Sequence, residues 1–211
     1  MTVSADLLLQ AYRGGIFPMA ERSDDPELFW VDPRRRGVIP LDGFRISRSL
    51  ARRLKRDDYT VTRNADFGGV VDACADRHET WINETIKALY QELHWRGAAH
   101  SIEVWQGRDL IGGVYGVAVG GCFCGESMFS RQTDGSKIAL AWLIDLLRRS
   151  SFSLFDTQFL TPHLASLGGT EITRAAYRGL LEEALTQPAD FTSQPLATSG
   201  QDVVQRNTQT S

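Results

Sequence analysis

Residues 100–128 have the sequence HSIEVWQGRDLIGGVYGVAVGGCFCGESM, the clearest structural signal in the chain. Three runs rich in β-branched and aromatic residues, 101–106, 110–119 and 122–128, are separated by a Gly-Arg-Asp turn and a Gly-Gly turn. Short glycine-containing turns of this kind join neighbouring antiparallel strands. The sequence therefore predicts a three-stranded antiparallel meander at its centre.

Helical periodicity is present on both sides of the meander. Residues 67–75 and 83–96 have the apolar spacing of helices that pack on a sheet, and so do residues 136–149, with Ser136 as the expected cap. A strand at 152–158, expected parallel to the last meander strand, and a helix at 173–185 complete the order. The fold class is therefore α+β, a mixed sheet flanked by helices, and its order of elements is similar to that of acetyltransferases of the GNAT type.

The chain divides into three parts by composition. Residues 1–63 predict a small N-terminal α/β lobe, with a helix at 4–13, short strands at 29–31, 38–40 and 59–63, and a basic helix at 47–56. Residues 64–186 contain the meander and form the expected catalytic domain. Residues 187–211 are dominated by Gln, Thr, Ser, Pro and Asp, which is typical of a flexible tail.

Composition narrows the class of protein. With 211 residues, 42% of them apolar, the chain can bury a core, and its longest apolar stretch, 138–147, is too short to cross a membrane. The start of the chain has no basic segment typical of an export signal. Three cysteines, Cys74, Cys122 and Cys124, are an odd number without zinc spacing, so we expect reduced thiols, no metal site and a cytoplasmic location.

Charge is distributed very unevenly. Residues 34–56 hold nine lysines and arginines against one acid, Asp42, a net charge of +8 that leaves −11 on the other 188 residues. Such a segment on an acidic body favours contact with a polyanion. The candidate contact residues are Arg45, Arg48, Arg52, Arg53, Lys55 and Arg56.

Ten short segments occur in order between about residues 5 and 178. They are YRGGIFP (12–18), WVDPR (30–34), ISRS (46–49), TWI (80–82), HSIEVW (100–105), GGVYG (112–116), FCGESMFS (123–130), SK (136–137), DTQ (156–158) and HLASLG (163–168). Together they closely resemble bacterial leucyl/phenylalanyl-tRNA–protein transferases. The resemblance implies an aminoacyltransferase that moves Leu or Phe, with Met as a further candidate, from aminoacyl-tRNA to the N-terminal Lys or Arg of proteins, which marks them for N-end rule degradation.

The resemblance assigns catalytic roles to Asp156 and Gln158. These residues lie at i and i+2 of the predicted strand, so their side chains are on one face. In the family the matching aspartate polarises the glutamine, whose amide oxygen accepts a hydrogen bond from the attacking amine. Because an amide is a poor base, we expect Gln158 to orient the amine rather than to remove its proton.

The same resemblance assigns the donor substrate's contacts. The matching Glu126 holds the α-ammonium of the aminoacyl group, and Trp81 stacks on the terminal adenine of the tRNA. Many relatives have a second tryptophan where this chain has Met19, so we expect weaker stacking on that side. An apolar pocket for the Leu or Phe side chain has as candidates Val114, Met128, Leu143, Leu147 and Phe155.

Two other functions are compatible with parts of the sequence. An acyl-CoA-dependent N-acetyltransferase would share the fold, but the segment after Met128 lacks the Gly-rich loop that binds CoA, and the transferase family implies neither cofactor nor metal. A non-catalytic tRNA-binding module would use the basic segment alone. For the leading hypothesis the basic segment contacts the tRNA acceptor stem, and we expect a monomer.

Overall fold

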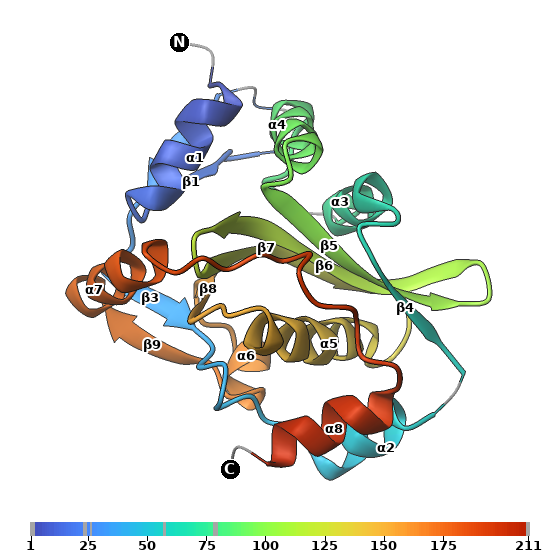
Figure 1. Ribbon diagram of the computed structural model, residues 1–211. Helices are drawn as coiled ribbons and strands as arrows, with labels where there is room; N and C mark the ends of the chain where they lie inside the picture. Colours follow the sequence, from blue (N-terminus) through green and yellow to red (C-terminus); the bar gives the residue numbers. More distant parts are fainter. Residues whose placement is uncertain (1–2, 23–24, 26, 57, 78–79, 210–211) are drawn as a thin grey trace.

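The computed structural model describes residues 3–22, 25, 27–56, 58–77 and 80–209. Its centre is a seven-stranded mixed sheet of order β4-β5-β6-β7-β8-β3-β9 (Figure 1), and β1 and β2 form a second, two-stranded sheet. The strands are β1 (Phe17–Met19), β2 (Phe29–Val31), β3 (Arg35–Val38), β4 (Thr60–Arg63), β5 (Ala99–Gln106), β6 (Asp109–Val119), β7 (Cys122–Ser130), β8 (Leu154–Gln158) and β9 (Thr170–Thr173).

The predicted meander is confirmed as β5, β6 and β7, which pair antiparallel with one another. The predicted strand that follows is β8, and it pairs parallel with β7, as expected. The long connecting helix is α5 (Gly135–Arg149), but its predicted cap was wrong. Asp134 is the N-cap residue and Ser136 lies inside the first turn, where its backbone N–H meets the Ser130 hydroxyl.

Helices cover both faces of the large sheet and create two apolar cores. One core is covered by α1 (Ala5–Arg13), α3 (Phe67–Ala75), α4 (Glu84–Trp95) and α7 (Arg174–Leu185). The other is covered by α2 (Arg48–Leu54), α5, α6 (Pro162–Ser166) and α8 (Gly200–Thr208). Helix α5 is apolar on nearly all sides because it lies between the sheet and α2 and α8. The mixed α+β class is confirmed.

Residues 1–63 do not have a large sheet of their own. Strand β4 pairs with β5 at one edge of the seven-stranded sheet, and β3 lies between β8 and β9. The strand expected at 38–40 is β3, three residues earlier, where it can pair on both sides. Strands β1 and β9 and helices α6 and α8 were not expected from the sequence.

The expectation of a flexible tail was wrong for residues 187–209. Phe191 is buried and stacks against His100 and Phe123, with ring centroids 4.3 and 5.3 Å away. Helix α8 buries Val203 and Val204 against the core that contains α2 and α5, and Ser199 caps it. A few well-placed apolar residues are therefore enough to fix a polar segment, and only 210–211 of the expected tail lie outside the described residues.

Membrane-spanning helices and metal clusters are both absent from the described residues. None of the helices in these residues is long and apolar enough to cross a lipid bilayer. These residues also contain no cluster of three or more His, Cys, Asp or Glu side chains that could hold a metal ion. The cysteines Cys74, Cys122 and Cys124 are buried free thiols.

We predict that Phe191→Ala lowers the free energy of unfolding by about 3–5 kcal/mol, because it removes a buried aromatic ring and leaves a cavity. Urea titration followed by circular dichroism measures the change. The control is Leu180→Ala on α7, whose side chain is 43% exposed and whose loss should cost less than about 0.5 kcal/mol. If the free energy of unfolding fell as little in Phe191→Ala as in the control, Phe191 would not contribute to the core.

Candidate active site

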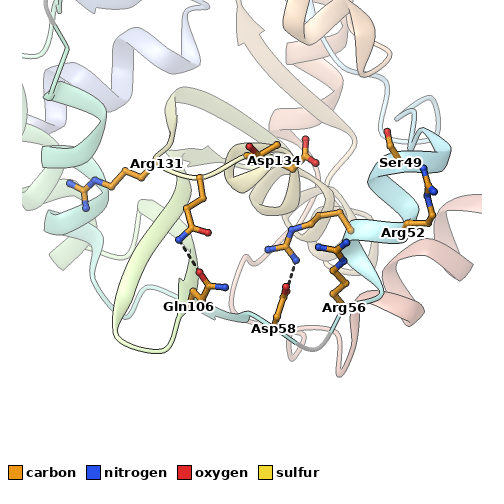
Figure 2. A pocket seen from close by; sticks show the side chains of 10 residues that line it. Ser49, Arg52, Arg56, Asp58, Gln106, Arg131 and Asp134 are labelled. Atoms are coloured by element: carbon orange, nitrogen blue, oxygen red, sulfur yellow. Dashed lines mark hydrogen bonds and ion pairs between the residues drawn. The ribbon is translucent and has the colours of Figure 1, made fainter.

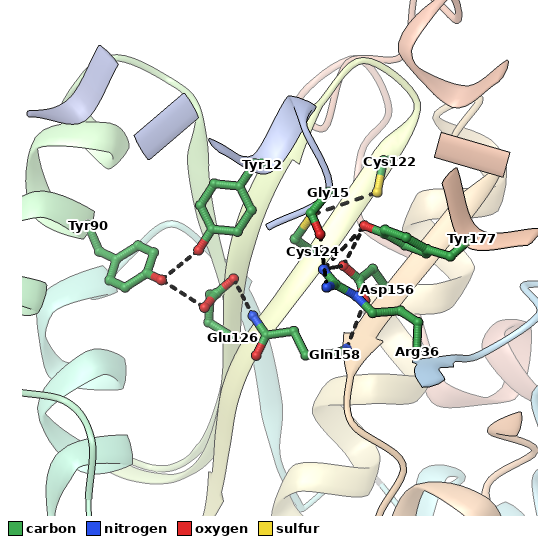
Figure 3. A network of polar contacts seen from close by, with 10 residues as sticks. All are labelled: Tyr12, Gly15, Arg36, Tyr90, Cys122, Cys124, Glu126, Asp156, Gln158 and Tyr177. Carbon is green, nitrogen blue, oxygen red and sulfur yellow. Dashed lines mark hydrogen bonds and ion pairs between the residues drawn. The ribbon is translucent and has the colours of Figure 1, made fainter. Parts of the chain in front are cut away.

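The site lies where the parallel strands β7 and β8 separate. Their backbone pairing runs from Cys122 and Leu154 to Cys124 and Asp156, and then stops. Beyond this point side chains join the strands: the amide nitrogen Nε2 of Gln158 donates to Oε1 of Glu126 over 2.9 Å (Figure 3). The divergence leaves a gap between two central strands, and polar groups line it.

Asp156 is fully buried and accepts four hydrogen bonds. Arg36 donates to both carboxylate oxygens, from Nε at 2.8 Å and from Nη2 at 2.6 Å. The Tyr177 hydroxyl donates to Oδ2 at 2.9 Å, and the backbone N–H of Gln158 donates to Oδ1 at 2.8 Å. The carboxylate is thereby fixed in position and its charge is balanced.

Arg36 is itself enclosed. Its guanidinium carbon lies 4.6 Å from the ring centre of Phe17 and 4.4 Å from that of Tyr177, and Nη1 donates to the carbonyl of Gly15. Burial alone would lower the pKa of Arg36, but the hydrogen bonds to Asp156 raise it above its usual value. Counting Arg36 among the surface cations of residues 34–56 was therefore wrong, because only 2% of this residue is exposed.

Gln158 has an unusual backbone. Its φ of +62° lies in the left-handed region, which costs free energy for any residue other than glycine. The bond from its N–H to Asp156 holds this conformation, and Gly37 pairs opposite it. A Cβ atom at Gly37 would come within 2.6 Å of the carbonyl carbon of Phe159, so glycine is required there.

Glu126 is the second buried carboxylate, and its partners are neutral. Tyr90 donates to Oε2 at 2.7 Å and also contacts the hydroxyl of Tyr12 at 2.6 Å, while Gln158 donates to Oε1. Burial raises the pKa of Glu126 to about 7, although the hydrogen bond from Tyr90 opposes the shift. The group therefore changes its charge near neutral pH and has no cationic partner among the described residues.

A small hollow of about 70 Å³, here called the apolar pocket, opens beside Glu126. Of the residues predicted to line it, Val114, Met128 and Phe155 do so. Leu143 and Leu147 do not, because they lie one and two turns farther along α5, inside the core. The α5 position that reaches the pocket is Leu140, and the remaining lining residues are Gly125, Ser127, Thr157 and Leu164.

Within the described part of the chain, the other predicted residues neither line the apolar pocket nor bond to Glu126 or Asp156. Trp81 is half-buried in the connection between α3 and α4, and Met19 pairs with Phe29 across β1 and β2. Helix α2 buries Leu50 and Leu54 and exposes its basic side. Of the predicted basic residues, Arg53 is half-buried and paired with Asp58, and five are exposed: Arg45, Arg48, Arg52, Lys55 and Arg56.

Several members of the network were not found from the sequence. Arg36 was counted with its charged neighbours, and Tyr12 and Tyr90 have the helical spacing of ordinary core residues. No sequence pattern linked Tyr177 to Asp156, because Tyr177 lies on helix α7, 21 residues after Asp156 on strand β8. These partners could be identified only from the structure, because the fold brings them together from distant parts of the chain.

We predict that Arg36→Ala lowers the free energy of unfolding by about 3–5 kcal/mol, because it leaves the Asp156 carboxylate buried and unpaired. Chemical denaturation measures the loss. The control is the neighbouring Arg35→Ala, which removes an exposed contact with Glu171 and should cost less than about 1 kcal/mol. If the two variants were equally stable, the buried ion pair would not be a structural constraint.

Comparison with known proteins gives a consistent result. The family model described as "Leucyl/phenylalanyl-tRNA protein transferase" matches residues 38–182, and the model of the N-terminal domain of the same family matches residues 1–34. A protein named leucyl/phenylalanyl-tRNA–protein transferase from Ruegeria sp. (strain TM1040) is 66% identical over 211 residues, 100% of each chain. A protein of the same name from Cereibacter sphaeroides is 64% identical over 97% of this chain and 96% of its own.

Two solved structures are distantly similar to this chain. FemX has a TM-score of 0.48 and 12% identity, covering 86% of this chain and 73% of its own. L-PGS from Bacillus licheniformis has a TM-score of 0.44 and 17% identity, covering 74% and 59%. Neither similarity supports an inference about this chain. The matches over its full length do: the chain belongs to the leucyl/phenylalanyl-tRNA protein transferase family.

Proposed function

We propose that this protein transfers Leu or Phe from aminoacyl-tRNA to the N-terminal Lys or Arg of acceptor proteins, and so marks them for N-end rule degradation. The observation that carries the proposal is Glu126, a buried carboxylate that lies beside an apolar pocket and has no cationic partner in the part of the chain that the structure describes. An aminoacyl ester offers the two matching groups, an α-ammonium and an apolar side chain. Family membership supports the same reaction.

In this proposal Glu126 and the apolar pocket hold the donor. The α-ammonium contacts the Glu126 carboxylate and supplies the charge that its neutral partners do not. The Leu or Phe side chain enters the pocket between Val114, Met128 and Phe155. A polar donor side chain would lose its hydration there without finding partners.

Gln158 orients the acceptor amine. Its Nε2 is committed to Glu126, which leaves its amide oxygen to accept a hydrogen bond from the attacking amine. Asp156 contacts Gln158 through the backbone N–H, not through the side-chain amide. We therefore assign Asp156 a positioning role, in place of the direct polarisation that the resemblance implied.

The reaction itself needs little acid–base chemistry. The amine nitrogen attacks the ester carbonyl carbon, a peptide bond forms, and the ester C–O bond to the ribose breaks. The proton lost by the amine ends on the ribose oxygen. An α-amino group titrates near pH 8, so about a tenth of it is neutral at pH 7. Holding the amine against the activated ester supplies most of the acceleration.

The proposal also includes the fold type, the division of the chain into two parts, its oligomeric state and its location. We assign the fold to the GNAT type on the basis of the β5-β6-β7 meander, α5 and the parallel strand β8. Residues 64–186 would form the catalytic part, and residues 1–63 would supply the basic helix α2. A monomeric state and a cytoplasmic location stay predictions.

A transfer assay tests the proposed function. Purified protein is mixed with radiolabelled Phe-tRNA and a peptide that begins with Arg, and the label is followed into the peptide. We predict transfer by the unaltered protein and at least about a hundredfold loss of kcat/KM in Glu126→Ala and Gln158→Ala. The control Glu182→Gln, on the exposed side of α7, should keep full activity.

Absence of transfer would reject the proposal. Retained tRNA binding that ignores whether the tRNA is charged would then support a binding module, and transfer of an acyl group from added acyl-CoA would support an acetyltransferase. Either result would require a different role for Glu126.

The titration of Glu126 gives a separate prediction. Its pKa near 7 means that the carboxylate fraction rises about eightfold from pH 6 to pH 7.5, and the affinity for an α-ammonium should rise by somewhat less, because an amine that titrates near pH 8 is about a quarter neutral at pH 7.5. The measurement uses a stable amide analogue of phenylalanyl-adenosine and calorimetry at both pH values. Glu126→Gln should bind weakly and with little pH dependence below pH 7. An affinity that falls between pH 6 and 7.5 would contradict the assigned contact.

A further inference from the structure

Two more hollows continue from the apolar pocket toward helix α2. The first, here called the middle hollow, has a volume of about 400 Å³ and shares Met128 with the apolar pocket. The second, the basic hollow, has a volume of about 810 Å³ and shares Arg131 with the middle hollow. The three hollows therefore lie one after another between Glu126 and α2, each sharing a lining side chain with the next.

The residues that line this series change in character along it. The apolar pocket is lined mainly by hydrophobic side chains. The middle hollow is lined by Arg77, Arg131, the half-exposed His163 and small polar residues, with Asp76 as its one acid. The basic hollow contains Arg52, Arg53, Arg56 and again Arg131. Cations become more frequent as the series approaches α2.

Most of these cations have no ion pair within the described residues. The acids of the basic hollow are already used: Asp58 pairs with Arg53, and Asp134 pairs with Lys137. Among the described residues, the Arg131 side chain has one long hydrogen bond, from Nη1 to the carbonyl of Leu110 at 3.4 Å, and its guanidinium lies 5.5 Å from the ring centre of Phe129. Figure 2 shows Arg131 on the side of the hollow opposite Arg52 and Arg56.

Polar groups of the middle hollow also suit an oxygen-rich ligand. Arg77 donates to Ser127 and to the carbonyl of Met128, which holds its guanidinium at the rim beside the apolar pocket. The Nε2 atom of His163 is buried without a hydrogen-bond partner among the described residues. Burial lowers the pKa of His163, which favours the neutral ring, and a neutral ring can donate or accept a hydrogen bond.

We infer that the middle hollow carries the phosphodiesters of the single-stranded CCA end of the donor tRNA from the apolar pocket to α2, with Arg131 as the phosphate-binding residue between the two hollows. The inference rests on the proposed function. The aminoacyl group held at Glu126 is esterified to the terminal ribose of the tRNA, and the preceding nucleotides are joined to that ribose. The nucleotide chain must therefore lead away from the apolar pocket. A groove with unpaired cations attracts phosphates and repels the Lys or Arg of the acceptor.

The path assigns different ligands to Arg131 and Arg52. Arg131 would contact the CCA end, whereas Arg52 on α2 would contact the double-stranded stem beyond it. Three phenylalanyl donors separate these contacts: phenylalanyl-adenosine without phosphates, phenylalanyl-CCA without a stem, and complete Phe-tRNA. Transfer to a peptide that begins with Arg is measured with each.

We predict that Arg131→Gln lowers kcat/KM about tenfold for both phenylalanyl-CCA and Phe-tRNA and leaves phenylalanyl-adenosine unchanged, the loss expected for one charge-assisted contact. Arg52→Gln should lower kcat/KM for Phe-tRNA alone. Arg131→Lys keeps the charge and should retain most of the activity, which a purely structural role of Arg131 would not allow.

Salt dependence is a second readout that needs only Phe-tRNA. The slope of log(kcat/KM) against log salt concentration should become shallower by about 0.7 in Arg131→Gln, because one fewer phosphate is neutralised. An unchanged slope together with unchanged use of phenylalanyl-CCA would overturn the path but leave the proposed transfer intact. Absence of transfer by the unaltered protein from every donor would reject both.

Discussion

The buried ion pair of Arg36 and Asp156 is the constraint on which the site depends. It joins β3 to β8, and through the carbonyl of Gly15 and the hydroxyl of Tyr177 it also ties in the end of α1 and helix α7. Two charges removed from water are tolerable only when their hydrogen bonds are nearly complete, as they are here. The result is an Asp156 carboxylate that holds the strained backbone of Gln158 in place.

The two buried carboxylates of the site differ because their partners differ. Asp156 faces a guanidinium, whereas Glu126 faces a tyrosine hydroxyl and an amide, which stabilise an anion without neutralising it. A buried carboxylate in such surroundings shifts its pKa upward and gains most from a cation that arrives with a ligand. The fold thereby pairs one acid with a buried cation and gives the other only neutral partners among the described residues, which is what the proposed contact with an ammonium group requires.

Hydrophobic periodicity and turn residues in the sequence predicted the helices and strands of the central sheet. The meander, α5 and β8 follow from periodicity and turns, and the motifs led to Glu126, Asp156 and Gln158. Arg36 was counted with the charged residues 34–56 because the sequence of an arginine run does not show which of its side chains is buried. The segment around Phe191 was missed because its partners, His100 and Phe123, lie far away in the sequence. Leu143 and Leu147 were misplaced because periodicity gives the face of a helix but not which turn reaches a pocket.

The charges of the three hollows also explain how one site could hold two substrates in order. The region around Glu126 favours a cation, and the series of hollows beyond Met128 favours anions. An aminoacyl-tRNA has its ammonium at one end and its phosphates along the rest, so only one orientation satisfies both regions. In the proposed function this orientation places the ester beside the amide oxygen of Gln158, so the electrostatics that would bind the tRNA would also present its reactive carbon to the acceptor amine.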